Sequence, residues 1–346
     1  MTQCSQEALM ETYRTEDYHT GGEPFRIVTD PGAPLPGRTV AERRMHAMSD
    51  GPADRVRQIL CHEPRGHADM YGGFITPPDD DGAHFGVLFW HKDGFSTACG
   101  HGTIALGVWA VRTGRVSAPE TGTTDVVIDV PSGRVTARVH TEQGQIIGVD
   151  FLSVPGYVLA SSVPVRTSAG EFLVDVSYGG AIYAQLDAST VGLSIDPEHT
   201  GELIALGRQI KWALNETEVA RHPVDPRLSG IYGTILFQRL PATEPGEIRQ
   251  RNATIFADGE LDRSPCGSGT AARLATLAAA GELGAGEMLV HSSIVDSRFT
   301  ARIVDRLEVA GYPAVLPEVT GMAYRTGDST FTVDPLDPLV PGFVLR

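Results

Sequence analysis

Residues 96–105 read Ser-Thr-Ala-Cys-Gly-His-Gly-Thr-Ile-Ala, and residues 264–272 read Ser-Pro-Cys-Gly-Ser-Gly-Thr-Ala-Ala. Both contain the pattern Cys-Gly-x-Gly-Thr-x-Ala, which begins at Cys99 in one copy and at Cys266 in the other. The two copies lie about half the chain apart, so they indicate two related halves. We predict that the halves are two lobes facing each other.

The surroundings of the two copies match as well. Each copy follows an apolar run and precedes a small-residue segment of helical length, which ends at a glycine: 85–90, 103–113 and Gly114 in the first half, 253–257, 270–280 and Gly281 in the second. This order predicts a strand, a short loop, a cysteine, a glycine-rich turn and a buried helix in each half.

A cysteine at the start of a helix has a recognisable chemistry. The helix start offers unpaired backbone N–H groups and the positive end of the helix dipole, which together attract an anion such as a carboxylate. The same position lowers the pKa of a thiol and favours the thiolate. Two such sites facing each other predict a two-base centre that moves a proton on and off a carbon next to a carboxylate.

Three other interpretations compete for the same residues. Both turns fit the nucleotide-binding pattern G-x-G-x-x-A, but we see no clear acidic partner in a βαβ unit about 20 residues further on, and neither turn has the lysine of a phosphate loop. Buried structural cysteine is the second interpretation, and it leaves the matching glycine frames unexplained. The third is a metal site among the histidines of the first third, where no zinc-ligand spacing occurs.

The chain resembles the proline racemase family from about residue 17 to the end. The resemblance rests on six motifs, which are His19-Thr20-Gly21-Gly22-Glu23-Pro24, Glu63-Pro64-Arg65-Gly66-His67-Ala68-Asp69-Met70-Tyr71-Gly72, Cys99-Gly100-His101, Tyr178-Gly179-Gly180, Tyr232-Gly233-Thr234 and Asp262-Arg263-Ser264-Pro265-Cys266-Gly267-Ser268-Gly269. The family contains proline racemases, hydroxyproline 2-epimerases and trans-3-hydroxy-L-proline dehydratases.

The resemblance implies a fold and roles for particular residues. The fold is an α/β (α+β) architecture of the diaminopimelate-epimerase type, with two similar lobes, each a curled sheet around a central helix, and the active site in the cleft between them. Cys99 and Cys266 become the catalytic acid and base. The substrate-binding residues are Gly100, His101, Gly267 and Ser268, whose amides meet the carboxylate, and Asp262, which meets the ring nitrogen.

Two features of the sequence point to different activities within the family. Racemases and epimerases have cysteine at both catalytic positions, as here, whereas the dehydratases typically have threonine at the second. The segment 178–184 and the turn 267–269 look like the dehydratase version, because racemases usually have asparagine where Ala181 stands. The leading prediction is a proline racemase or hydroxyproline 2-epimerase, and the alternative is a trans-3-hydroxy-L-proline dehydratase. A non-catalytic amino-acid-binding protein is a remote alternative.

Composition narrows the class of protein. A net charge of −15 argues against binding to nucleic acid or anionic membranes. Four cysteines without a disulfide pattern, no signal-peptide core and no long apolar run lead us to expect a cytoplasmic protein. The resemblance to the proline racemase family implies an enzyme that uses neither a metal nor a cofactor such as pyridoxal phosphate. Its expected partner is a small substrate, proline or a hydroxyproline, and a homodimer stays open. The expected domains are a flexible tail (1–16), a lobe with Cys99 (17–155 plus 328–346) and a lobe with Cys266 (156–327).

Overall fold

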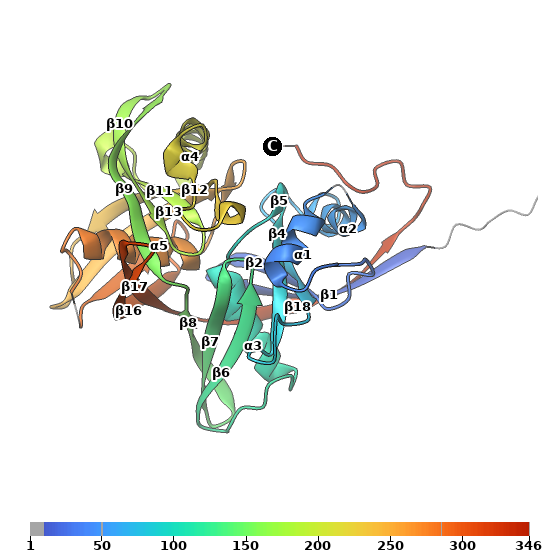
Figure 1. The fold of residues 1–346 in the computed structure, drawn as a ribbon. Coiled ribbons are helices and arrows are strands. Elements are labelled where there is room, and N and C mark those ends of the chain that lie inside the picture. The colour runs from blue at the N-terminus through green and yellow to red at the C-terminus, as the bar shows by residue number, and fades with distance from the viewer. Residues whose placement is uncertain (1–9, 50, 285, 346) are drawn as a thin grey trace, which may run out of the picture.

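The computed structural model describes residues 10–49, 51–284 and 286–345, and these residues form two lobes joined by one continuous sheet (Figure 1). Each lobe contains a long buried helix, which is α3 (Gly100–Arg112) in the first lobe and α5 (Gly267–Ala279) in the second. Strands surround each of these helices. The predicted α+β fold with two similar lobes is therefore confirmed.

The strands divide between the lobes. The first lobe contains β1 (Glu11–Thr20), β2 (Glu23–Val28), β3 (Tyr71–Thr76), β4 (Phe85–His91), β5 (Gly94–Phe95), β6 (Gly122–Val130), β7 (Gly133–Glu142), β8 (Gln145–Leu152) and β18 (Ala323–Val333). The second contains β9 (Gly156–Thr167), β10 (Gly170–Tyr178), β11 (Ile182–Asp187), β12 (Ile231–Leu240), β13 (Glu247–Phe256), β14 (Glu260–Leu261), β15 (Met288–Ser292), β16 (Arg298–Val309) and β17 (Tyr312–Gly321). The outer helices are α1 (Val40–Ala47), α2 (Pro52–Cys61) and α4 (Thr200–Asn215), and short 3-10 helices lie at 188–191, 197–199, 218–220 and 226–228.

The two central helices are buried on all sides. Every residue of 100–110 and of 267–277 is buried, as expected for a helix that is made of small and apolar residues all round. The predicted helices at 103–113 and 270–280 are confirmed, but both begin three residues earlier. Their glycines therefore lie inside the first helical turn rather than in a preceding loop.

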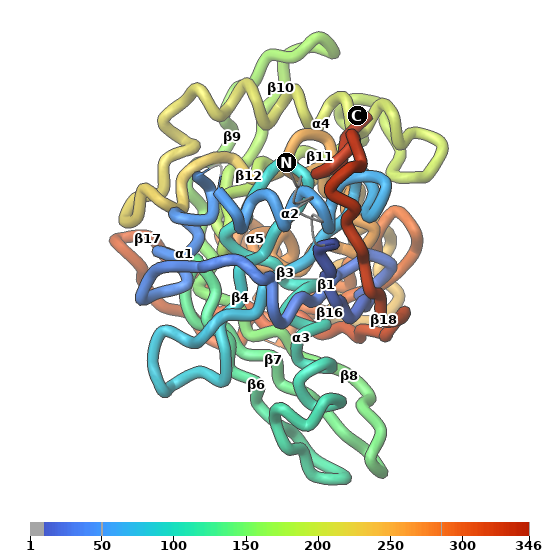
Figure 2. The backbone as a smooth tube through the Cα atoms, turned by 90° about the vertical axis from the view of Figure 1, so that its right-hand side faces the viewer, coloured from blue at the N-terminus to red at the C-terminus, as the bar shows by residue number. Residues whose placement is uncertain are grey.

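The C-terminal part of the chain returns to the first lobe. Strand β18 pairs antiparallel with β1 along its whole length, from Ala323 opposite Thr20 to Val333 opposite Glu11. Figures 1 and 2 show the two strands side by side, although they come from opposite ends of the sequence. Residues 11–16, which we predicted as part of a flexible tail, lie in β1 instead, because Tyr13 and Thr15 are buried under this pairing. Residues 1–9 of that tail lie outside the described residues.

One strand connects the two lobes. Residues 318–321 of β17 pair with β8 of the first lobe, and residues 314–315 pair with β9 of the second. This strand joins the part of the sheet in the first lobe to the part in the second. Among the described residues, none of the helices has the length and apolar character needed to cross a membrane.

Candidate active site

The starts of the two central helices touch each other. A methyl group on Gly100 would lie 2.5 Å from Cα of Gly267, and one on Gly267 would lie 2.6 Å from Cα of Gly100. Contacts below 3.0 Å are sterically forbidden, so only glycine fits at either position. The free amides of both helix starts consequently converge on one small region, as the repeated sequence pattern predicts.

Cys99 occupies the N-cap position of α3. Its backbone is extended, with φ −154°, and the Gly102 N–H donates a hydrogen bond of 3.1 Å to Sγ. Both ring nitrogens of His101 lie 3.5 Å from the same sulfur. The side chain is only 4% exposed, and this burial raises the pKa of the Cys99 thiol well above its usual range, against the lowering effect of the Gly102 amide.

Cys266 occupies the N-cap position of α5 with a different backbone. Its φ is +64°, a left-handed conformation that is unfavourable for a residue with a side chain by about 1–2 kcal/mol. The Tyr183 hydroxyl lies 3.7 Å from its Sγ. Burial raises the pKa of the Cys266 thiol, and the nearby Asp262 carboxylate raises it further. The two thiols therefore match in sequence frame and burial but differ in backbone and neighbours.

Two buried carboxyl groups lie beside the second cysteine. Asp262 accepts a hydrogen bond of 2.8 Å from the Ser264 N–H, and burial raises the pKa of Asp262 to about 6. Glu23, from the first lobe, accepts a hydrogen bond of 2.8 Å from the Arg263 N–H. Its second oxygen, Oε1, is buried without a hydrogen-bond partner in the part of the chain that the structure describes. Burial raises the pKa of Glu23 well above normal, and the charge of Asp262 raises it further. A buried carboxyl oxygen without a partner, close enough to a second carboxyl group to feel its charge, is suited to a cationic ligand group such as an ammonium.

The structure brings every predicted site residue to this region. Ser268 lies in the first turn of α5, where its hydroxyl and that of Tyr183 are 2.8 Å apart. His101 lies in the first turn of α3, and burial lowers its pKa to about 3, so its ring is neutral. Sequence reasoning missed Glu23 and Tyr183 as site residues. Glu23 lies in the motif 19–24 and Tyr183 in the segment 178–184, but their spacing from the cysteines carries no periodic signal.

A group of potential metal ligands lies nearby. One ligand atom each from His91, Asp93 and Glu260 falls within 4.8 Å of the others. Sequence spacing gave no hint of this group, because its members come from both lobes. The Lys92 ammonium lies 2.6 Å from the Asp93 carboxylate and 4.0 Å from that of Glu260, so a protein cation already provides positive charge there.

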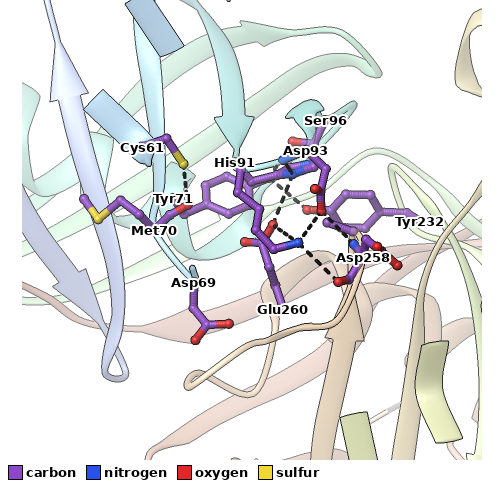
Figure 3. A network of polar contacts seen from close by, with 12 residues as sticks. Cys61, Asp69, Met70, Tyr71, His91, Asp93, Ser96, Tyr232, Asp258 and Glu260 are labelled. Carbon is purple, nitrogen blue, oxygen red and sulfur yellow. Dashed lines mark hydrogen bonds and ion pairs between the residues drawn. The ribbon is translucent and has the colours of Figure 1, made fainter. Parts of the chain in front are cut away.

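The lobes also meet at the tips of two hairpins that lead to the cysteines. The turn between β4 and β5 carries Lys92 and Asp93, and the turn between β13 and β14 carries Asp258. The Asp258 N–H donates to the Asp93 carboxylate at 2.8 Å (Figure 3). The Lys92 ammonium donates to the Asp258 carbonyl at 3.2 Å. These two hydrogen bonds join the first lobe to the second at the hairpin tips.

Comparison with known proteins gives consistent relatives. The profile of the family described as Proline racemase matches residues 16–344. The chain is 42% identical to a trans-3-hydroxy-L-proline dehydratase of Bacillus cereus over 338 residues, covering 97% of this chain and 99% of that protein. It is 43% identical to a 3-hydroxyproline 2-epimerase of Burkholderia multivorans over 343 residues, covering 98% and 99%. The crystal structure of a hydroxyproline epimerase from Agrobacterium vitis with bound trans-4-hydroxy-L-proline is similar, with a TM-score of 0.87 and 30% identity over 96% of each chain.

Proposed function

Because the chain belongs to the proline racemase family, we propose that it inverts the Cα of proline or a hydroxyproline without a cofactor, with Cys99 and Cys266 as its acid and base. The observation that carries the proposal is the burial of both thiols at two helix starts that touch through Gly100 and Gly267. One thiolate takes the α-proton, and the opposite thiol donates a proton to the other face of the same carbon. Exchanging the two roles gives the reverse reaction.

The carboxylate of the substrate would bind between the helix starts. The amides of Gly100, His101, Gly267 and Ser268 have no helical partner and point into the region where the helices meet. Negative charge moves onto the carboxylate as the α-proton leaves. Amides that are already oriented stabilise this charge more in the transition state than in the ground state, which lowers the barrier.

The ring nitrogen of the substrate would bind at the two carboxyl groups. Burial raises the pKa of both Asp262 and Glu23, and Glu23 has one oxygen without a hydrogen-bond partner among the described residues. An entering zwitterion brings an ammonium group to this place. The ammonium also offsets the effect of burial on the thiols, since a nearby positive charge lowers the pKa of a thiol and allows one of them to ionise.

We take 3-hydroxyproline as the leading substrate. The relatives at 42–43% identity cover nearly the whole chain, and their names specify 3-hydroxyproline for both a dehydratase and an epimerase. Proline and 4-hydroxyproline are the remaining substrates of this class. The presence of cysteine at both catalytic positions favours the epimerase over the dehydratase.

Dehydration of trans-3-hydroxy-L-proline is the second candidate. Ala181, which belongs to the segment that resembles dehydratases, packs in the same buried cluster as Cys266. After removal of the α-proton, the electron pair at Cα either takes a proton from the second thiol or forms a double bond to C3. In the latter case the C3–O bond breaks, the hydroxyl leaves as water with a proton from the site, and the enamine tautomerises to Δ1-pyrroline-2-carboxylate. The same carbanion can therefore give either the inverted amino acid or the pyrroline product.

Incubation in D2O distinguishes the candidates. L-proline, trans-4-hydroxy-L-proline and trans-3-hydroxy-L-proline are each incubated with the protein and examined by chiral chromatography and mass spectrometry. Inversion with one deuterium at Cα supports the epimerase, and a pyrroline product supports the dehydratase. Calorimetric binding without either product would identify an amino-acid-binding protein and refute the proposal.

Location and lobe boundaries complete the proposal. We place the enzyme in the reducing cytoplasm because Cys61, Cys99 and Cys266 are free thiols. We keep the expected lobe boundary at residues 155–156 and move the other from 327–328 to the start of β18 at Ala323, because the whole of this strand pairs with β1 of the first lobe. The first boundary follows the break between β8 and β9.

A further inference from the structure

Three tyrosines form an arc from one thiol to the other across the boundary between the lobes. Tyr71 at the start of β3 contacts the His101 ring, with 4.9 Å between ring centroids, and His101 lies against Cys99. Tyr183 on β11 reaches Cys266 with its hydroxyl. Tyr232 on β12 lies between them, with its ring 5.7 Å from that of Tyr183.

The hydroxyl groups of Tyr71 and Tyr232 meet where the lobes meet. The two oxygens are 3.1 Å apart, and Tyr71 makes a second, very short hydrogen bond to the Ser96 hydroxyl (Figure 3). A phenol can donate one hydrogen bond and accept others, and the Tyr232 hydroxyl has only the Tyr71 hydroxyl as a hydrogen-bond partner among the described residues. Burial raises the pKa of both phenols well above normal, so both keep their protons.

The proton transfer at Cα does not explain these hydroxyls. The two thiols already supply a base and an acid, and phenylalanine would line the arc equally well. Placing phenol oxygens in a buried aromatic wall carries a desolvation cost unless they have partners. Unused hydrogen-bonding capacity at such a place indicates a polar group on the ligand.

The position of the arc indicates which part of the ligand this is. The carboxylate is assigned to the helix starts and the ring nitrogen to Asp262 and Glu23. We assign the ring carbons to the arc, because it borders Cys99 through His101 and borders Cys266 through Tyr183. We propose that Tyr71 and Tyr232 form the subsite for the ring hydroxyl of the substrate and so select hydroxyproline over proline. This inference rests on the proposed function and adds to it the residues that determine specificity.

Tyr232→Phe is the sharpest test, because it removes one hydroxyl and keeps the ring stacked on Phe256, 5.8 Å away. A site built around a hydrogen bond discriminates strongly against a ligand that lacks the group. We expect the ratio of kcat/KM for trans-3-hydroxy-L-proline to kcat/KM for L-proline to fall at least tenfold, with the value for proline unchanged within about threefold. Tyr71→Phe should lower the same ratio, and it also leaves the Ser96 hydroxyl without that partner.

Tyr157→Phe provides the matched control. Tyr157 is a buried tyrosine of β9 whose hydroxyl is bonded to the His222 ring at 2.9 Å. Its replacement should leave the substrate ratio unchanged, and melting temperatures measured for all variants show whether any change in the ratio follows a loss of folding.

Three results would overturn the inference. They are an unchanged ratio in Tyr232→Phe, an equal loss of activity on both substrates, and a wild-type enzyme that prefers proline. If the wild type turns over none of the substrates, the proposed function fails separately. The subsite is then judged by calorimetry, where Tyr232→Phe must still lower the affinity for hydroxyproline relative to proline.

Discussion

Replacing Gly100 with alanine measures how closely the two helix starts must approach. The added methyl carbon would lie 2.5 Å from Cα of Gly267, 2.7 Å from its carbonyl carbon and 2.8 Å from the Ser268 nitrogen. Ordinary contact begins near 3.4 Å, so the helix starts must separate by about 0.9 Å. All three obstructing atoms belong to the backbone, and no side-chain rotation relieves the contact.

The expected effect on activity is larger than that on stability. Overpacking of a core costs about 1–3 kcal/mol, which lowers the melting temperature by several degrees. A displacement of about 1 Å between catalytic groups reduces a rate by roughly 10²-fold. The methyl group would also cover the Ser268 amide, which is one of the proposed carboxylate donors. We therefore expect kcat/KM for inversion to fall about 100-fold in a folded protein.

Gly201→Ala is the matched control for this variant. Gly201 lies in the first turn of α4, is exposed and has no neighbour within 4 Å of an added methyl group. Alanine there should keep full activity and raise stability by about 0.5–1 kcal/mol. Thermal unfolding and chiral assays of both variants test the reasoning. Wild-type rates and an unchanged melting temperature in Gly100→Ala would show that the helix starts do not need to touch.

Three more predictions concern the thiols and Asp262. Cys99→Ser and Cys266→Ser should each abolish inversion, measured by chiral chromatography, and near-full activity in either would exclude the two-base mechanism. Cys266→Thr should abolish inversion but keep dehydration of trans-3-hydroxy-L-proline, measured as pyrroline formation, because elimination needs no proton donor on the far face of Cα; loss of both reactions would exclude the shared carbanion. Asp262→Asn should raise KM and flatten the dependence of melting temperature on pH. The pKa of Asp262 rises from 3.8 to about 6 on folding, so the folded state binds the proton of Asp262 more tightly than the unfolded state does. The wild type therefore loses stability as the pH rises from 3.8 to about 6. Parallel pH profiles of wild type and variant would contradict this assignment.

The repeated motif predicted more of the fold than its length suggests. Small residues on every face of 103–113 and 270–280 require a helix buried on all sides, which fixes both central helices. The tandem glycines led us to expect turns before these helices, and that was wrong. The sequence alone does not explain why positions 100 and 267 must be glycine. The explanation is that each lies against the start of the opposite central helix, which is half the chain away in sequence.

The missed parts of the site have a common cause. Tyr183 and Tyr232 are placed by the long-range pairing of β11 with β12, and Glu23 reaches the second lobe through its hydrogen bond from the Arg263 N–H, so no local spacing relates these residues to the cysteines. The alternation of a strand predicts which face a side chain occupies, but not which strand lies next to it. The pairing of β1 with β18 is another example, since only the complete fold brings residues 11–16 against 328–333.

Because the cysteines differ in burial, their rates of labelling by a thiol reagent report on different motions of the protein. Cys99 and Cys266 are 4% and 5% exposed at the helix starts, where the two lobes meet, whereas Cys61 is fully buried in a separate apolar cluster with α2 and β4. A thiol reagent reaches the first two when the lobes part and reaches Cys61 only when the first lobe loses its packing. The lag between the two labelling events, read by mass spectrometry, therefore separates breathing of the cleft from unfolding of the chain. A bound substrate that holds the lobes together would slow the labelling of Cys99 and Cys266. The labelling of Cys61 would then still report on unfolding of the first lobe.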